Sequence, residues 1–160
     1  MLEEARTRTA ELQARMKDSG LEIALITDES TIAYFAGFWG YLSVEFGRPT
    51  FLIIQADDAP IVITPLMESE MVGAMTWVDD VRTWEDAGDN RWENVLARTL
   101  GRSHKTIGIE RNAMPIIVRN WIDDQLGGVE LRDITPLIAA MRMIKSPLEI
   151  KVMKQAGQIA

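Results

Sequence analysis

The sequence of 160 residues contains no cysteine and a single histidine, His104. Without cysteine, the protein has no disulfide framework and no thiol nucleophile. A metal site needs clustered histidine, cysteine or carboxylate side chains, whereas His104 stands alone in a polar stretch before an expected strand. We therefore interpret His104 as a solvated loop residue and assign no metal ligand and no cofactor to this sequence.

Nucleotide-binding and nucleophilic motifs are also missing. Residues 27–30 (TDES) follow the first expected strand, where a dinucleotide-binding fold would need G-x-G-x-x-G. Neither a G-x-x-x-x-G-K-[ST] loop nor a G-x-S-x-G elbow occurs. Paired acidic residues at 57–58, 79–80 and 123–124 fall in expected turns or on outward helix faces, where they favour solubility. No residue is therefore assigned a catalytic role.

Long apolar runs and basic clusters are scarce. No run approaches the ~18 residues that span a membrane, and the N-terminus lacks the basic and apolar regions of a secretion signal. Acidic residues outnumber basic ones by 24 to 17, which gives a net charge of −7. With no Lys/Arg cluster, we expect no nucleic-acid partner, no membrane contact and a cytoplasmic location.

Hydrophobic residues make up 47% of the sequence and charged residues 26%, as in a typical soluble globular domain. Apolar periodicity predicts helices at 2–18, 66–75, 91–100, 115–126 and 135–143. A further short helix is predicted between a cap at Asp28 or Ser30 and Gly37. Strands are predicted at 21–27, 50–55, 61–64, 106–110 and 129–132, and a short strand is predicted within 77–84. The strands at 50–55 and 61–64 are expected to form a hairpin around residues 57–60. This alternation predicts an α/β fold in which helices flank a mixed β-sheet.

A last helix is expected to begin at residue 146. Ser146 suits the N-cap, Pro147 suits the first helical position, and Glu149 completes a reciprocal capping box. An apolar stripe follows at helical spacing, formed by Leu148, Val152, Met153, Ala156, Ile159 and Ala160. Because the stripe needs a partner surface and the sequence ends without a helix stop signal, we expect a second domain to follow.

One segment of the chain offers a candidate binding group. Gly47 permits a turn closed to other residues, and Arg48 is held extended because it precedes Pro49. A guanidinium on such a support suits bidentate binding of a carboxylate, and Phe46 would cover an apolar part of the ligand. In the alternative reading Arg48 pairs with a nearby acidic residue and Phe46 packs in the core, and the residues alone favour this second reading.

The tryptophans divide into two groups. Trp92 and Trp121 lie on expected helices at positions suited to core packing. Trp39 and Tyr41 lie in a loop, where large apolar rings are costly to expose. Either this loop folds back on the domain or it meets a partner surface, and the sequence does not favour one reading over the other.

Four segments resemble the N-terminal domain of the creatinase/prolidase family. They are residues 20–26 (GLEIALI), 28–38 (DESTIAYFAGF), 107–110 (IGIE) and 141–150 (MRMIKSPLEI). The last is similar to the family's R-x-I-K-S-x-x-E-I junction between two domains, and Thr31 stands where the family usually has asparagine. The resemblance implies a three-layer α/β domain at 1–145 and the first helix of a catalytic domain at 146–160.

Residues 46–49 (FGRP) are similar to the creatinase subgroup of that family. In creatinase the matching phenylalanine and arginine reach into the active site of the partner subunit, where the arginine holds the substrate carboxylate. The resemblance therefore reverses the ranking given above. It implies that Phe46 and Arg48 bind a small carboxylate-bearing or peptide substrate across a homodimer interface.

The resemblance also implies a parent hydrolase, either an Xaa-Pro peptidase or a creatinase-like amidinohydrolase. Peptidase members use two divalent metal ions (Mn, Co or Zn), and creatinase-like members use a histidine instead. All of those groups would lie outside these 160 residues, so we expect this chain alone to be inactive. The alternative is a non-catalytic protein-binding module of the same fold.

Overall fold

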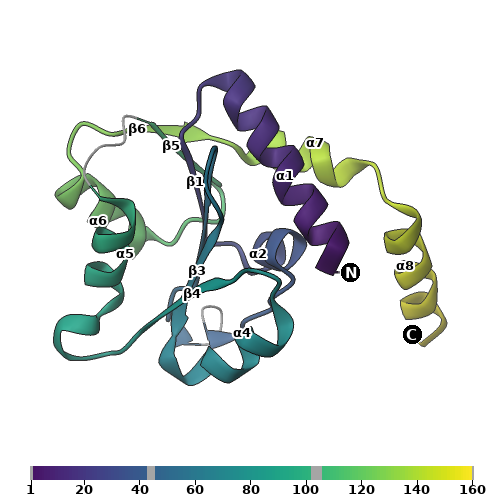
Figure 1. Cartoon of the computed structure of the whole chain (residues 1–160), viewed down its shortest axis with the longest axis horizontal. Coiled ribbons are helices and arrows are strands. Elements are labelled where there is room, and N and C mark those ends of the chain that lie inside the picture. Colours follow the sequence, from purple (N-terminus) through teal and green to yellow (C-terminus); the bar gives the residue numbers. More distant parts are fainter. Residues whose placement is uncertain (1, 43–45, 102–105, 160) are drawn as a thin grey trace.

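A six-stranded mixed sheet forms the centre of the computed structural model, which describes residues 2–42, 46–101 and 106–159 (Figure 1). The strands are β1 (Ile23–Ile26), β2 (Phe51–Gln55), β3 (Ile61–Pro65), β4 (Asp80–Trp84), β5 (Thr106–Ile109) and β6 (Glu130–Asp133). The described helices include α1 (Leu2–Ser19), α2 (Glu29–Ala36), α4 (Ser69–Met75), α5 (Trp92–Leu100), α6 (Ile116–Gln125), α7 (Thr135–Met143) and α8 (Pro147–Ile159). Short 3-10 turns lie at Leu66–Glu68 (η1) and Gly88–Asn90 (η2).

The strand order is β4-β3-β2-β1-β5-β6. β1 pairs antiparallel with β2, aligning Ile23 with Gln55, and parallel with β5, aligning Ile23 with Ile107. β2 and β3 form the predicted hairpin, and the outer pairs β3–β4 and β5–β6 are parallel. Because β1 and β5 are parallel neighbours, their carboxyl ends lie side by side at the same end of the sheet.

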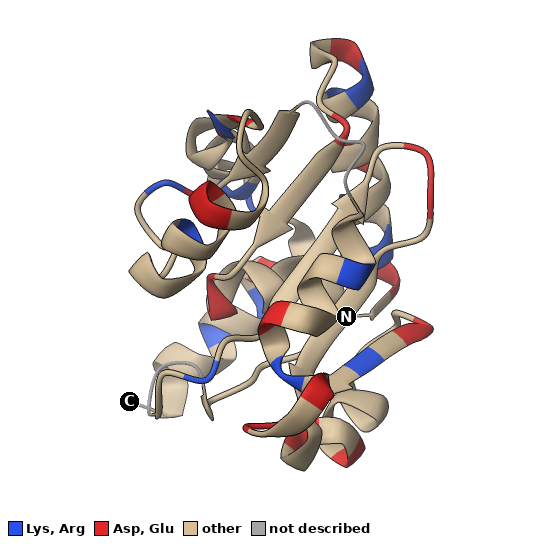
Figure 2. Ribbon diagram, turned by 90° about the vertical axis from the view of Figure 1, so that its left-hand side faces the viewer, with Lys and Arg blue, Asp and Glu red and all other residues tan. Residues whose placement is uncertain are grey.

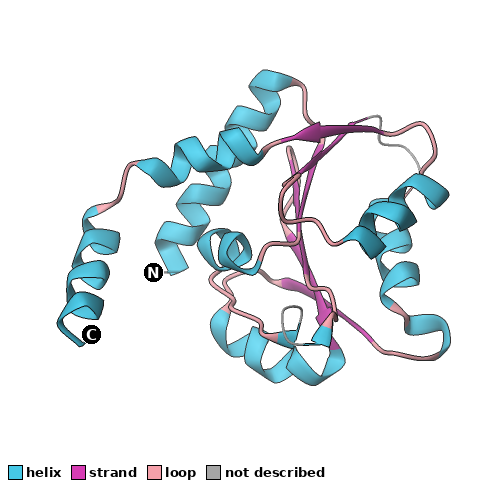
Figure 3. Ribbon diagram, turned by 180° about the vertical axis from the view of Figure 1, so that it is seen from behind, coloured by secondary structure: helices cyan, strands magenta, loops and turns pink. Residues whose placement is uncertain are grey.

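Each face of the sheet carries its own apolar layer. In β1, Ala24 and Ile26 face the layer built with α1, α2, α4 and α7, whereas Ile23 and Leu25 face the layer built with α5 and α6. Figure 3 shows these two helical layers on opposite sides of the strands. A central strand buried on both faces is apolar at every position, and the predicted three-layer α/β fold is confirmed.

Most predicted elements are present: β1 is shorter than the predicted 21–27, and β4 is the short strand predicted within 77–84. Leu21 is buried, yet its backbone N–H donates to Met16 and closes the end of α1 instead of extending β1. The backbone N–H of Trp77 donates to Ala36, and that of Val78 donates to the Thr76 hydroxyl, so β4 begins only at Asp80. Local turns and caps take these donors away from the sheet.

The capping box at the start of α8 is confirmed. The Ser146 N–H donates to Glu149 Oε2 at 2.9 Å, and the Glu149 N–H donates to Ser146 Oγ at 3.1 Å. In contrast, no residue of α8 is buried, and the helix stands apart from the body beside the N-terminal end of α1 (Figure 1). The predicted apolar stripe is therefore present but mostly uncovered, with Met153 59% exposed and Ile159 88% exposed.

Charged residues of both signs are spread over the face of the molecule seen in Figure 2. On the face seen in Figure 2, segments with Lys and Arg are interspersed with segments carrying Asp and Glu, and neither charge sign is confined to one element. That face offers no basic stripe of the kind that follows a phosphate backbone. Within the described residues, no helix has both the length and the apolarity that crossing a bilayer requires.

Candidate functional site

Arg48 projects from a backbone that is fixed on both sides. Gly47 adopts a φ of 64°, in the left-handed region that glycine enters without steric cost. The Arg48 N–H donates to the Leu42 carbonyl at 3.3 Å, and the Pro49 carbonyl accepts from Trp84 Nε1 at 2.9 Å. These bonds attach the segment to the preceding loop and to the end of β4, just ahead of β2.

The Arg48 guanidinium has two partners in the structure. Its Nη2 lies 2.5 Å from Asp86 Oδ2, and its Nη1 donates to Met67 Sδ at 3.0 Å. The three side chains border an open cleft of about 450 Å³, which is also lined by Pro65, Leu66, Trp84, Glu85 and Ala87. The predicted pairing of Arg48 with a nearby acidic residue is present, on a side chain that is 35% exposed.

Phe46 does not pack in the core. Its side chain is 66% exposed, so the reading that placed it among the buried residues is wrong. Phe46 therefore lies at the surface, two residues before Arg48, next to Gly47 with its positive φ.

In the loop at residues 38–42, before this segment, buried and exposed side chains alternate. Phe38 and Leu42 are buried, whereas Trp39 is 53% exposed and Tyr41 is 49% exposed. The loop thus folds back through two residues and presents two aromatic rings to solvent. The reading in which the loop folds back on the domain holds for Phe38 and Leu42, and a partner surface at Trp39 and Tyr41 stays a prediction.

Glu68 holds this loop in its course, although no sequence motif points to that residue. It is only 2% exposed, and its carboxylate accepts from the Tyr41 N–H at 3.3 Å and from Thr64 Oγ1 at 2.8 Å. A Cβ added at Gly40 would lie 3.3 Å from a Glu68 carboxylate oxygen, so glycine lets the loop approach closely. Glu68 therefore sets the position from which Trp39 and Tyr41 project.

A second polar cluster lies where the carboxyl ends of β1 and β5 meet. Asp28 caps α2 by accepting from the Thr31 N–H at 2.8 Å, which resolves the choice between Asp28 and Ser30. The Thr31 hydroxyl also lies 2.8 Å from Glu110 Oε1. Arg142 of α7 donates to Ser30 Oγ at 3.2 Å and to Thr31 Oγ1 at 3.1 Å. The cluster connects α2, β5 and α7.

Glu110 is the unusual member of this cluster. It is 7% exposed, and its Oε2 is buried without a hydrogen-bond partner among the described residues. Burial raises the pKa of the Glu110 carboxyl to about 7, and the Asp28 carboxylate adds to the rise against the opposing effects of Thr31 and Arg142. In the sequence, Glu110 stands out only as the end of a predicted strand and of the family motif 107–110, because its partner Thr31 is 79 positions away.

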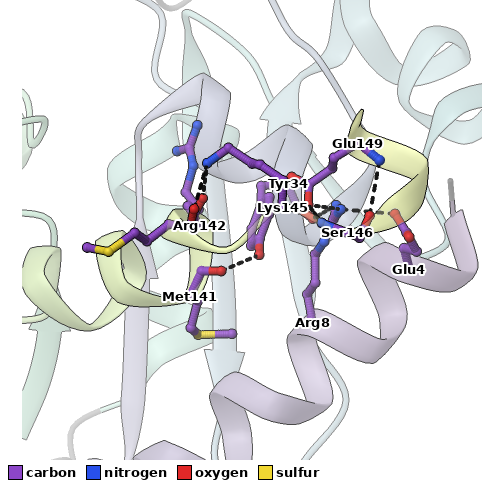
Figure 4. Close-up of polar contacts among 9 residues, drawn as sticks. Glu4, Arg8, Tyr34, Met141, Arg142, Lys145, Ser146 and Glu149 are labelled. Atoms are coloured by element: carbon purple, nitrogen blue, oxygen red, sulfur yellow. Dashed lines mark hydrogen bonds and ion pairs between the residues drawn. The ribbon is translucent and has the colours of Figure 1, made fainter. Parts of the chain in front are cut away.

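Arg8 joins α8 to the body of the domain (Figure 4). Its Nη2 lies 3.0 Å from Glu4 Oε2 and 3.4 Å from Glu149 Oε2, and its Nη1 donates to the Tyr34 carbonyl at 3.3 Å. The guanidinium carbon lies 4.1 Å from the centre of the Tyr34 ring, in cation–π contact. Beside this junction, residues of α1 and α8 line a largely apolar cavity of about 540 Å³.

Other predicted candidates lie apart from these sites. His104 lies outside the described residues, so its predicted role as a solvated residue is not tested. Across residues 2–42, 46–101 and 106–159, no three His, Asp or Glu side chains come together as a metal site would require. Trp92 and Trp121 pack against the apolar layer of α5 and α6 with ring centres 5.9 Å apart, as predicted.

A family model described as the creatinase/prolidase N-terminal domain matches residues 8–144. An Xaa-Pro dipeptidase of Lactobacillus helveticus is 29% identical over 150 residues, which cover 91% of this chain and 39% of that protein. Creatinase from a Bacillus species is 23% identical over 161 residues, which cover 99% of this chain and 38% of the enzyme. The chain thus spans about two fifths of the length of these relatives.

Solved structures show the same architecture. The prolidase of Thermococcus sibiricus aligns with a TM-score of 0.81 and 26% identity, over 95% of this chain and 40% of its own. A proline dipeptidase structure from Streptococcus pneumoniae aligns with a TM-score of 0.75 and 22% identity, over 86% of this chain and 98% of its own. The second likeness supports the fold alone.

Proposed function

Because the chain belongs to the creatinase/prolidase N-terminal domain family, we propose that it is the N-terminal domain of a C–N bond hydrolase. The relatives named above are enzymes, a dipeptidase and a creatinase. On this proposal residues 1–145 form the domain and residues 146–160 open a catalytic domain. The reacting groups, whether two divalent metal ions or a histidine, belong to that second domain, so the 160-residue chain alone is expected to be inactive.

The role proposed for this domain is to hold the carboxylate of a small substrate through Arg48. The observation that carries the proposal is the pairing of Arg48 with the Asp86 carboxylate at the edge of an open cleft, on a fixed backbone. A guanidinium that already binds one carboxylate there is suited to bind that of a ligand. Phe46, exposed two residues earlier, is proposed to cover an apolar part of the same ligand.

We further propose that Arg48 serves the active site of a partner subunit in a homodimer. Trp39 and Tyr41 are each about half exposed on a loop that the buried Glu68 holds in place. Aromatic residues are enriched in the cores of protein interfaces, where their large apolar rings leave water. We therefore propose that Trp39 and Tyr41, a few residues before Arg48 in the sequence, contact the partner subunit.

Substitution of Arg48 in the complete enzyme tests this function. Arg48→Ala is expected to lower kcat/KM for a carboxylate-bearing substrate on the order of 30- to 1000-fold, with folding and dimerisation intact. This fold-change corresponds to a loss of ~2–4 kcal/mol of transition-state stabilisation. Arg48→Lys is expected to lose less, because it keeps the charge but not the planar fork. The substrates to assay are an Xaa-Pro dipeptide and creatine, the classes that the names of the relatives indicate.

Arg91→Ala is the matched control for this experiment. Arg91 is a half-exposed surface arginine that pairs with Glu93 at 2.8 Å, away from the cleft, and its removal is expected to leave the kinetics unchanged. Normal kinetics of the Arg48→Ala enzyme as a dimer would contradict substrate binding by Arg48. That result would favour a non-catalytic protein-binding module.

A further inference from the structure

The two terminal nitrogens of Arg48 are both engaged in the structure. Nη2 contacts Asp86 Oδ2 at 2.5 Å, and Nη1 donates to Met67 Sδ at 3.0 Å. A ligand carboxylate that binds end-on needs these same two nitrogens for its two oxygens. The groups that now contact them are one carboxylate oxygen and one thioether sulfur, which is a weak acceptor.

We infer that Asp86 is an internal competitor for Arg48, which occupies the guanidinium until a ligand carboxylate displaces it. This inference rests on the proposed binding of substrate by Arg48. A residue that oriented Arg48 for its ligand would be expected to hold the inner edge of the guanidinium and leave the outer nitrogens free. Asp86 instead contacts an outer nitrogen, so its carboxylate lies where a ligand carboxylate would bind end-on.

The position of Asp86 allows such a displacement. Its side chain is 61% exposed, and it follows β4 in a segment that turns at Gly88, where φ is 74°. Exposed ion pairs of this kind are weak because water screens the charges and the long side chains lose freedom. A ligand carboxylate that offers two oxygens to Arg48 therefore replaces one ion-pair contact and one weak contact to sulfur with two charge-assisted hydrogen bonds.

The competition sets the size of the expected effect. If the Asp86 pair holds Arg48 for a fraction of the time, the apparent affinity for substrate falls in proportion to the fraction of Arg48 that is free. For an exposed ion pair, removing the competitor should lower KM by about two- to fivefold. The value of kcat should not change, because the pair is broken before the chemical step.

The same competition acts equally on charged and neutral ligands. A carboxylate and its carboxamide analogue both need Arg48 to be free of Asp86, so the competition weakens both apparent affinities by the same factor. The carboxamide binds Arg48 more weakly than the carboxylate because it carries no charge. Removing the Asp86 charge should therefore strengthen the binding of both ligands and leave the ratio of their inhibition constants unchanged.

The test compares Asp86→Asn with Arg48→Ala in the complete enzyme, using a substrate and its carboxamide. Asp86→Asn is expected to lower KM about two- to fivefold at constant kcat, and to lower the inhibition constant of the carboxamide by the same factor, because both ligands need free Arg48. In an Arg48→Ala background the same substitution should have no effect. Asp89→Asn removes an equal charge three residues away, in η2, and should leave KM unchanged.

The outcomes separate the two claims. An unchanged or raised KM in Asp86→Asn, together with a large loss in Arg48→Ala, would overturn the competition and leave the proposed function in place. Normal kinetics in Arg48→Ala would overturn both. An equal fall in KM for Asp89→Asn would indicate a general charge effect and would also overturn the role of Asp86.

Discussion

Among single residues, Glu110 has the largest expected effect on how stability depends on pH. Its pKa in the folded protein is about 7 because the side chain is buried, against an ordinary value of 4.5. Between these two values the folded state binds more protons than the unfolded state. The stabilisation is therefore complete below about pH 4.5 and is lost as the pH rises through 7.

Glu110→Gln is expected to remove this part of the pH dependence. The free energy of unfolding of the natural chain should fall between pH 4.5 and 7, and the variant should fall less over the same window and be the more stable above it. Denaturant unfolding at several pH values measures both slopes. Glu130→Gln, on an exposed side chain of β6, is the control and should keep the natural slope. Parallel pH profiles for natural chain and Glu110→Gln would contradict the account.

Gly108 gives a second prediction for a single residue, based on packing. A Cβ at this position in β5 would lie 2.7 Å from Leu21 Cδ2 and 2.8 Å from Ile134 Cγ2. Gly108→Ala should therefore destabilise the fold by about 1–3 kcal/mol through overpacking. Gly73 of α4 has open space around its Cβ position, so Gly73→Ala should instead stabilise by about 0.5–1 kcal/mol. Equal effects of the two changes on the unfolding midpoint would count against this reading.

Residues with local signals were the ones that sequence reasoning could identify. The capping box of Ser146 and Glu149 and the turn at Gly47 depend on neighbours within a few positions. Glu68 and Glu110 were missed because their burial comes from tertiary packing. The residues alone favoured burial of Phe46, because sequence shows that a side chain is apolar but not which way it points, and only the family resemblance favoured an accessible Phe46.

At the scale of elements, the order and type of helices and strands could be predicted, and their ends could not. The spacing of apolar residues predicts whether a segment is a helix or a strand, because it reflects which face of the element is buried. The ends depend on which backbone donors are taken by turns, as at Leu21 and Val78. The two apolar layers follow from alternation along β1 and β2 once both faces are covered.

The exposed stripe of α8 leads to a prediction about this helix. Val152, Met153 and Ile159 are at least 41% exposed, and the cavity beside α1 is largely apolar. Burial of such residues is favourable by about 25 cal/mol per Å², so the 160-residue chain should self-associate as its concentration rises. Removal of residues 146–160 should abolish this association in sedimentation equilibrium. Identical masses with and without the segment would show that α8 is not responsible.

At the scale of the whole molecule, the Arg48 cleft and the Arg8 junction are built from different elements of the three-layer domain. Arg48 and its cleft lie at the ends of β3 and β4, whereas the Arg8 junction connects α1, α2 and α8. The family and the architecture could be predicted from the sequence through a few motifs. The partner subunit proposed for Arg48 could not, because an interface is a property of two chains.

Subunit mixing tests the central claim, that Arg48 acts in the active site of the partner. Complete enzyme carrying Arg48→Ala is mixed with enzyme whose catalytic domain has been inactivated, and the subunits are allowed to exchange. Each mixed dimer would then combine an intact Arg48 with an intact catalytic domain at one site, restoring about a quarter of the normal activity at equal mixing. Continued absence of activity after exchange would contradict the claim.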